Sequence, residues 1–222
     1  MISIIIPTLN EARALPRTLV QLSAQPIAHE IIVCDGGSND DTAGVARTAP
    51  RVQWLNAPRG RGAQMNAGAR QAQGEWLLFL HADTMLPATA LDAIAELPAS
   101  VEAGCFHQAF SDARPLLRWV SSLHNWRCKR TRIMYGDQAM FVRRSVFEML
   151  GGFPETDLED VKLSELLRKR TTPILLPLTV TTDARKFLTR GILRSFGRIV
   201  LILLCHRYRL PLMGRRFFDP VR

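Results

Sequence analysis

The sequence predicts an α/β fold: a mainly parallel sheet with helices on both faces, followed by an amphipathic helical tail at the C-terminus. Short apolar runs and helix-period segments alternate four times in the first hundred residues, as in βαβ units. Apolar residues make up 47% of the 222 residues, which is typical of a folded domain. Polar residues directly follow the apolar runs, at the strand ends where parallel sheets bind ligands.

The first hundred residues contain four predicted strands, each a short apolar run that ends near a turn. Asn10 is expected to cap the first helix, which starts near Glu11 and has Pro16 in its first turns. The strands are expected at residues 3–7, 30–34, 52–55 and 76–80, and the helices at residues 11–22, from the turn at 35–38 to about 48, 61–73 and 88–97.

The alternation changes after residue 100. The chain contains no internal repeat, linker or low-complexity tract, so we expect one domain over residues 1–184 and a helical tail over residues 185–222. Further strands are expected at residues 104–110 and 138–142, and further helices at residues 115–130, 144–150 and 161–169.

The positive charge of the chain is concentrated in the tail. Residues 185–222 contain ten Lys and Arg and one acid, so they carry the whole net charge of +9. Residues 1–184 are neutral overall. An anionic partner is therefore expected to meet the tail.

The tail also has the spacing of an amphipathic helix. Lys186, Arg190, Arg194 and Arg198 recur every four residues and form a basic stripe. Two interpretations stay open: the helix lies on an anionic membrane surface, or its apolar side packs on the domain. The apolar run at residues 199–205 is far shorter than the roughly 20 residues that span a bilayer. The apolar side consists of Ile192, Phe196, Ile199, Val200 and Leu203.

The cysteines and the N-terminus bear on the compartment. The four cysteines are far apart and form no CxxC pair, so neither a zinc site nor a disulfide framework is expected. The first residues lack the basic region and the cleavage site of a secretory signal. A cytoplasmic location is therefore expected, with association at the inner membrane face as a further option through the tail. The cysteines are Cys34, Cys105, Cys128 and Cys205.

Asp83 follows a predicted strand in the segment FLHADT. A carboxylate at this edge suits Mg²⁺ or Mn²⁺, which bind one or two carboxylates together with phosphates and water. His81 is two residues earlier, and on an extended chain it would project to the same side and assist. The alternative is that Asp83 is an exposed loop residue that caps the next helix.

Glu159 and Asp160 form an acid pair at the start of a predicted helix. Either the pair caps the helix, where the helix dipole favours negative charge, or one acid accepts the proton of an attacking hydroxyl. Crowding of like charges raises one pKa of such a pair, which suits a base.

Two glycine-containing segments allow a ligand to approach the backbone. In the first, Asp35 precedes Gly36 and Gly37 and can accept hydrogen bonds from a nucleobase or a ribose. A tight turn capped by Asp35 is the equal alternative. In the second, Arg59 and Arg61 lie among glycines at a helix start, where phosphate can bind. The chain has neither a P-loop nor a complete GxGxxG motif.

Six motifs of the chain, in order, resemble those of family 2 inverting glycosyltransferases of GT-A fold. The similarity is greatest to small bacterial members that carry HAD in place of DxD, and it covers about residues 2–170. The motifs are IIIPTLNE, CDGGSNDDT, RGRGAQMNAG, FLHADT, GDQAMFVRRSVFEMLGGF and LEDVKLSELLRK.

The resemblance implies transfer of a sugar from a UDP- or GDP-sugar to an acceptor hydroxyl with inversion, assisted by Mn²⁺ or Mg²⁺. It implies Asp160 as catalytic base with Glu159 beside it, and Asp83 as metal ligand with His81. It places the nucleotide-sugar site at Thr8, Asn10 and Glu11 of the nucleoside pocket, Asp35 and Gly36 at the base, Arg61 and Asn66 beside base and phosphates, Ala82 and Asp83 at the diphosphate, and Asp137 and Gln138 near the donor sugar or acceptor.

Three departures from the family pattern shape the expectation. His81 replaces the first Asp of DxD, which leaves fewer carboxylates and is expected either to weaken metal affinity or to favour Mn²⁺. Gly36 replaces the second acid of DDGS. The QxxRW motif of processive synthases is absent, so a single transfer to a small-molecule or lipid-linked acceptor is expected.

Rival functions fit less of the sequence. A sugar-1-phosphate nucleotidyltransferase would carry a GxGTR-like loop where PTLNEAR lies. A nucleic-acid-binding protein could use the basic tail, but the neutral body argues against it. A glycoside hydrolase also needs two carboxylates, yet it would leave the DGGS turn and the HAD segment without a role.

Overall fold

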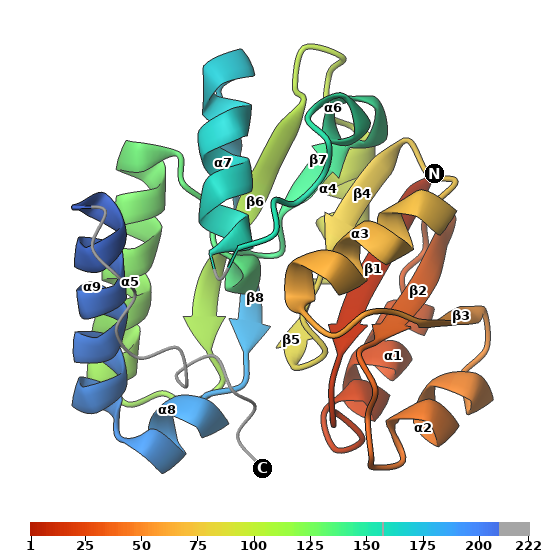
Figure 1. Ribbon diagram of the computed structural model, residues 1–222, viewed down its shortest axis with the longest axis horizontal. Coiled ribbons are helices and arrows are strands. Elements are labelled where there is room, and N and C mark those ends of the chain that lie inside the picture. Colours follow the sequence, from red (N-terminus) through yellow and green to blue (C-terminus); the bar gives the residue numbers. More distant parts are fainter. Residues whose placement is uncertain (157, 209–222) are drawn as a thin grey trace.

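The core of the fold is one eight-stranded sheet with helices on both faces (Figure 1). The computed structural model of the chain describes residues 1–156 and 158–208. The strand order is β3-β2-β1-β4-β7-β6-β8-β5. The strands are β1 (Ile2–Thr8), β2 (His29–Asp35), β3 (Val52–Asn56), β4 (Trp76–Phe79), β5 (Thr84–Met85), β6 (Ala103–Phe110), β7 (Phe141–Arg143) and β8 (Ile174–Thr182).

The helices fill the connections between these strands. A 3₁₀ turn, η1 (Gly136–Gln138), precedes β7. The α-helices are α1 (Leu15–Ser23), α2 (Thr42–Thr48), α3 (Arg61–Gln71), α4 (Ala90–Ala95), α5 (Pro115–Thr131), α6 (Arg144–Met149), α7 (Glu159–Arg170), α8 (Arg185–Arg190) and α9 (Ile192–Arg207).

The first half of the sheet is parallel, as predicted. β1 pairs in parallel with β2 and with β4, and β2 pairs in parallel with β3. In this register Thr8, the last residue of β1, lies opposite Asp35, the last residue of β2. The polar segments that follow these strands therefore start from one edge of the sheet.

Side-chain alternation along β1 assigns a different set of helices to each face of the sheet. Ile4 and Ile6 belong to a buried cluster with α1, α2 and α4. Ile5 belongs to a second buried cluster with α3, α6 and α7. Both faces of the strand are thus apolar and covered, which explains its uninterrupted apolar sequence.

The second half of the sheet mixes strand directions. β7 is antiparallel to both β4 and β6, whereas β6 and β8 are parallel, and β5 is antiparallel to β8. The sequence did not predict β5 or β8. β8 contains Pro177, next to a register shift between Phe106 and His107 of β6. Proline has no N–H to donate to the ladder and occurs in sheets at such irregularities.

Two predictions of local structure are wrong. Asn10 does not cap a helix, because α1 begins at Leu15, with Pro16 in the first turn that proline favours. Asn10 instead has a positive φ of 58°, a conformation that asparagine tolerates. Residues 138–140 do not form a strand, because Gln138 belongs to η1 and β7 starts only at Phe141.

The tail forms two helices rather than one. Gly191, with φ of 84°, separates α8 from α9, so the basic stripe expected from Lys186 onward is divided between two helix axes. α9 lies beside α5, where the rings of Phe196 and Trp119 meet edge to face at 5.4 Å (Figure 1). Part of the predicted tail, residues 209–222, lies outside the described residues, as does the side chain of Leu203. No described helix is both long enough and apolar enough to cross a membrane.

The contact between α3 and the sheet yields a stability prediction. A Cβ at Gly68 would lie 2.6 Å from both Sγ of Cys34 and Cγ2 of Ile5. Gly68→Ala should therefore force α3 away from β1 and β2 and destabilise the fold by about 1–3 kcal/mol, measured by urea unfolding.

Gly197→Ala in α9 is the matched control, because nothing lies within 4 Å of a Cβ there. This change should stabilise the protein by up to about 1 kcal/mol through helix propensity. Equal unfolding free energies for the two variants would contradict the close packing of α3.

Candidate active site

The turn after β2 is organised by the buried carboxylate of Asp35. Its Oδ2 accepts hydrogen bonds from the backbone N–H groups of Gly37, at 2.9 Å, and Ser38, at 2.8 Å. Its Oδ1 accepts from the hydroxyls of Thr8, at 3.2 Å, and Ser38. Four donors fill the acceptor capacity of the carboxylate. Asp35 therefore caps its own turn, and a contact with a nucleobase requires the Ser38 hydroxyl to turn away.

Gln64 of α3 explains why residue 36 has no side chain. Its Nε2 donates to the carbonyl oxygens of Thr8, at 2.7 Å, and Cys34, at 2.8 Å, where β1 and β2 end. A Cβ at Gly36 would lie 3.1 Å from this amide. The side chain of Gln64 thus occupies the space that the second acid of a DDGS turn would enter.

The loops after β1 and β2 are joined to each other. The backbone N–H of Asn10 donates to Oγ of Ser38 at 2.8 Å, and Oδ1 of Asn10 accepts from the N–H of Asn39 at 2.8 Å. The N–H of Glu11 donates to Oγ1 of Thr42 at 2.9 Å. These bonds hold the predicted nucleoside segment 8–11 against the turn at 35–38.

Three acids gather at the same edge of the sheet. Desolvation, together with the charges of Asp83, Asp40 and Asp183, raises the pKa of Glu11 to about 7, while the charge of Arg185 opposes this rise. Desolvation and the charge of Asp183 also raise the pKa of Asp83. The repulsion between these carboxylates marks a place that favours a cation.

Asp183 reaches this edge because β8 ends beside the segment after β4. The N–H of Asp183 donates to the carbonyl oxygen of Asp83 at 3.1 Å, and the hydroxyls of Thr84 and Thr182 are 3.2 Å apart. The sequence did not predict Asp183 because β8 was not predicted. The signal is an acid directly after a run of β-branched residues at 179–182.

A small pocket brings the predicted base and His81 together. The backbone N–H of Gly136 donates to Oδ2 of Asp160 at 2.8 Å, and the N–H of Val161 donates to Oδ1 at 2.8 Å. A Cβ at Gly136 would lie 2.6 Å from Nε2 of His81, so only glycine permits this approach. The pocket is lined by Met65, Phe79, His81, Gly136, Met140, Phe153, Glu159 and Asp160.

His81 links this pocket to the acid cluster, since it lies two residues before Asp83. Desolvation, and then the charge of Arg61, lowers the pKa of His81 to about 4. Its ring is therefore neutral at pH 7, as a metal ligand must be.

Glu159 is buried in an ion pair with Arg61 of α3, with Nε and Oε1 2.8 Å apart. Desolvation raises the pKa of Glu159, and the charge of Arg61 opposes this shift. The pair joins α3 to α7 and distinguishes the two acids: Glu159 is paired with Arg61, while both carboxylate oxygens of Asp160 accept hydrogen bonds from backbone N–H groups.

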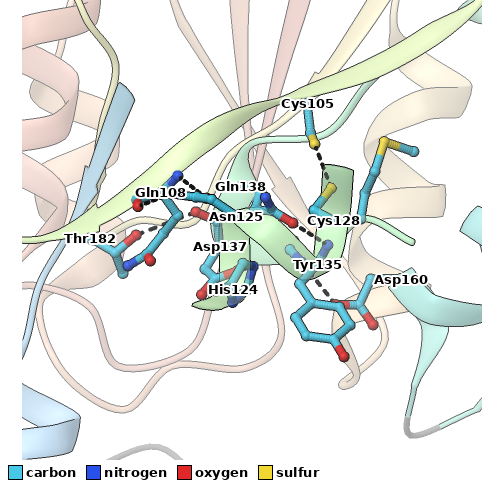
Figure 2. A network of polar contacts seen from close by, with 12 residues as sticks. Cys105, Gln108, His124, Asn125, Cys128, Tyr135, Asp137, Gln138, Asp160 and Thr182 are labelled. Atoms are coloured by element: carbon cyan, nitrogen blue, oxygen red, sulfur yellow. Dashed lines mark hydrogen bonds and ion pairs between the residues drawn. The ribbon is translucent and has the colours of Figure 1, made fainter. Parts of the chain in front are cut away.

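Asp137 and Gln138, which were predicted together, differ in what they contact (Figure 2). Gln138 is fully buried, and its amide bonds the N–H of Tyr135 and the carbonyl oxygen of Phe106. Asp137 lies 3.5 Å from Nε2 of His124, and neither its Oδ1 nor this Nε2 has a hydrogen-bond partner. Both atoms are buried, so they face each other rather than solvent, and the sequence did not predict His124 as the neighbour of Asp137.

Two other predicted site residues use their polar groups within the fold. The side-chain amide of Asn66 bonds both the carbonyl oxygen and the N–H of Phe153, at 2.9 and 2.8 Å. The carbonyl oxygen of Ala82 accepts from the hydroxyl of Thr18 at 2.6 Å. These hydrogen bonds hold the neighbouring segments in place. The contact of Asn66 and Ala82 with the nucleotide-sugar donor stays a prediction.

The described part of the site does not contain a complete set of protein ligands for a metal ion, but it suits a cation that also binds phosphate oxygens. Among residues 1–156 and 158–208, no three His, Cys, Asp or Glu side chains are arranged to hold a metal ion. Mg²⁺ and Mn²⁺ need only one or two carboxylates when phosphate oxygens complete the shell. The crowded carboxylates of Asp83 and Asp183 suit this arrangement.

The sequence profile of Glycosyl transferase family 2 matches residues 3–150. The chain belongs to this family, which confirms the resemblance of its motifs. The carboxylate pocket and the sheet edge described above are therefore the candidate active site of this family member.

Known proteins resemble the chain over different lengths. It is 41% identical over 93 residues to a PGL/p-HBAD biosynthesis glycosyltransferase of Mycobacterium bovis, covering 39% of this chain and 36% of the relative. It is 27% identical over 192 residues to the undecaprenyl-phosphate 4-deoxy-4-formamido-L-arabinose transferase of Pseudomonas fluorescens, covering 78% and 56%. The chain thus spans only part of the length of these relatives.

Solved structures confirm the predicted GT-A fold. A mannosyltransferase of Pyrobaculum calidifontis, solved with GDP-mannose and Mn²⁺, matches with a TM-score of 0.71 and 22% identity. The match covers 97% of this chain and 66% of that one.

The raised pKa of Glu11 predicts a pH dependence of stability. Between pH 4.5 and about 7 the folded protein keeps a proton on Glu11 that an unfolded glutamate releases. The folded state thus binds more protons, and its stability falls as pH rises through this window. Glu11→Gln should remove up to about 3 kcal/mol of this fall, measured by urea unfolding in EDTA.

Glu148→Gln is the control, because Glu148 is an exposed glutamate on α6. Its pH profile should follow the unmodified protein. Superimposable profiles for Glu11→Gln and the unmodified protein would show that Glu11 titrates normally.

Proposed function

We propose that the enzyme transfers a sugar from a UDP- or GDP-sugar to an acceptor hydroxyl with inversion of the anomeric configuration. One observation carries the proposal. Asp160, oriented by the N–H of Gly136, lines one pocket with His81, which lies two residues before Asp83 and its acid cluster. We propose that the base and the cation-binding edge face one cleft, as a direct displacement requires.

Asp160 is the proposed base because backbone hydrogen bonds orient its carboxylate. The N–H groups of Gly136 and Val161 donate to its two oxygens, whereas Glu159 is paired with Arg61. Asp160 accepts the proton of the acceptor hydroxyl as its oxygen attacks the anomeric carbon. The bond from that carbon to the diphosphate breaks on the opposite face, so configuration inverts and no covalent enzyme intermediate forms.

The charge of the leaving diphosphate falls at the acid edge. We propose that Asp83 and Asp183, with His81 nearby, hold Mn²⁺ or Mg²⁺, which would neutralise the developing charge of the diphosphate. His81 stays neutral at pH 7, and so it adds no repulsion toward the cation. The Mn²⁺ and GDP-mannose bound by the Pyrobaculum mannosyltransferase support this assignment.

The nucleoside is proposed to lie on the loops after β1 and β2. Thr8 and Asp35 form the floor, and Asn10 ties the two loops into one surface. Asp137, whose side chain is 28% exposed, is proposed to contact the donor sugar or the acceptor. The Pseudomonas relative, by its name an undecaprenyl-phosphate transferase, supports a lipid-linked acceptor.

The base assignment is tested by Asp160→Asn. The asparagine keeps the shape of the side chain but cannot take the proton, so turnover should fall at least about 100-fold. Turnover is measured as nucleoside diphosphate released from a panel of UDP- and GDP-sugars with Mn²⁺. Donor affinity, measured by thermal shift, should be unchanged.

Asp112→Asn is the matched control, because Asp112 is also partly buried but faces Arg114. It should keep full turnover. Near-normal turnover by Asp160→Asn would remove Asp160 from the mechanism.

A further inference from the structure

The outward face of α9 is apolar, contrary to the expectation for a surface helix. Four side chains on it, and that of Tyr208 directly after its last residue, have exposed fractions between 37% and 71%. Their spacing of 1, 3, 4 and 7 residues puts them on one side of the helix, and we call them the α9 stripe. The α9 stripe consists of Leu193, Val200, Leu201, Leu204 and Tyr208.

The opposite side of α9 already supplies the packing that holds the helix in place. Ile202 is buried in a cluster with Leu158 and Val161, and Ile199 packs against it. Phe196 meets Trp119 of α5 at 5.4 Å. The α9 stripe therefore does not contribute to the packing of α9 on the domain. An exposed apolar surface of this kind is typical of an interaction site.

α5 extends the apolar surface beside this contact. Trp119 and Trp126 are 52% and 56% exposed, and seven residues separate them, so they share one face of α5. The guanidinium of Arg130 lies 5.8 Å from the centre of the Trp126 ring. Tryptophan beside arginine is the composition that proteins place at the boundary of a lipid bilayer.

Charge decides which partner fits. The segments 115–131 and 185–208, which form α5, α8 and α9, contain ten Lys and Arg and no Asp or Glu. Two copies of this surface would repel each other, which disfavours a symmetric dimer. The phosphates of a nucleic acid could pair with the Lys and Arg side chains, but a nucleic acid would not bury the three exposed leucines.

We propose that the α9 stripe, with Trp119 and Trp126 at its side, docks on an anionic lipid membrane. The leucines enter the boundary between headgroups and acyl chains, and the surrounding arginines contact the anionic headgroups. The inner side of α9 packs on Leu158 and Val161, which flank Glu159 and Asp160. Docking therefore places the membrane on the far side of the helix that backs the proposed base, in reach of a lipid-borne acceptor. This last step rests on the proposed function.

The test is co-sedimentation of the full chain with vesicles of phosphatidylcholine, with and without phosphatidylglycerol. The unmodified protein should pellet only with vesicles that contain phosphatidylglycerol. The triple variant Leu193→Ser, Leu201→Ser, Leu204→Ser should bind at least about tenfold more weakly, since each tenfold corresponds to about 1.4 kcal/mol. The changes are on exposed side chains and should leave the melting temperature unaltered.

The control variant Val20→Ser, Met149→Ser removes apolar side chains of similar exposure, 71% and 64%, from α1 and from α6. It should pellet like the unmodified protein. The assay contains neither donor nor acceptor, so its outcome is independent of the proposed sugar transfer.

Several results would overturn the proposal. In the vesicle assay, these are equal pelleting of the triple variant and the unmodified protein, or pelleting that does not depend on phosphatidylglycerol. A dimer in light scattering that the serine changes dissociate would show that the α9 stripe binds a second copy. Retention on an RNA or DNA oligonucleotide that the same changes abolish would show that it binds nucleic acid.

Discussion

Repulsion between carboxylates at one edge of the sheet is the constraint on which the site depends. Glu11, Asp83 and Asp183 come from three distant segments. The charges of Asp83 and Asp183 raise the pKa of Glu11, and the charge of Asp183 also raises the pKa of Asp83. Arg185 lies 3.9 Å from Glu11 and offsets part of this charge. The carboxylates are close together because the strands bring their carboxyl ends to the same edge of the sheet. A cation shared with a diphosphate would reduce the repulsion between them.

α3 connects the two halves of the site. Near its start, Arg61 pairs with Glu159 beside the proposed base, and Gln64 bonds the ends of β1 and β2. Asn66 holds the backbone of Phe153, which lines the pocket. Gly68 lets the helix approach the sheet closely enough for these bonds. One short helix thus couples the nucleoside loops to the wall that carries Asp160.

The parts of the fold that sequence predicts best are those with a local cause. Uninterrupted apolar runs such as β1 and β4 are buried on both faces, so their sequence alone shows what they are. β8 is different, because Pro177 interrupts its pattern and the strand is completed only by pairing with β6. Without β8 there was no strand end to draw attention to Asp183.

Side-chain partners account for the rest of the difference between the predicted and observed site. The types and positions of Asp160 and Asp83 are visible in sequence, but the partners of Asn66 and Gln138 are far away in the chain. Only the folded structure shows that these amides form hydrogen bonds with backbone groups, and that His124 lies beside Asp137. Burial and pairing, unlike residue type, are tertiary properties.

The most direct test of this arrangement is a crystal structure of the enzyme with Mn²⁺ and the nucleoside diphosphate that stabilises it best, read by the anomalous signal of manganese. We expect the peak at about 2.0–2.3 Å from a carboxylate oxygen of Asp83. The diphosphate should bridge the metal and the loops at Thr8 and Asp35, and its free end should point toward Asp160. A manganese peak away from residues 81–83 and 183, or a nucleotide that cannot reach the Asp160 pocket, would contradict the shared cleft.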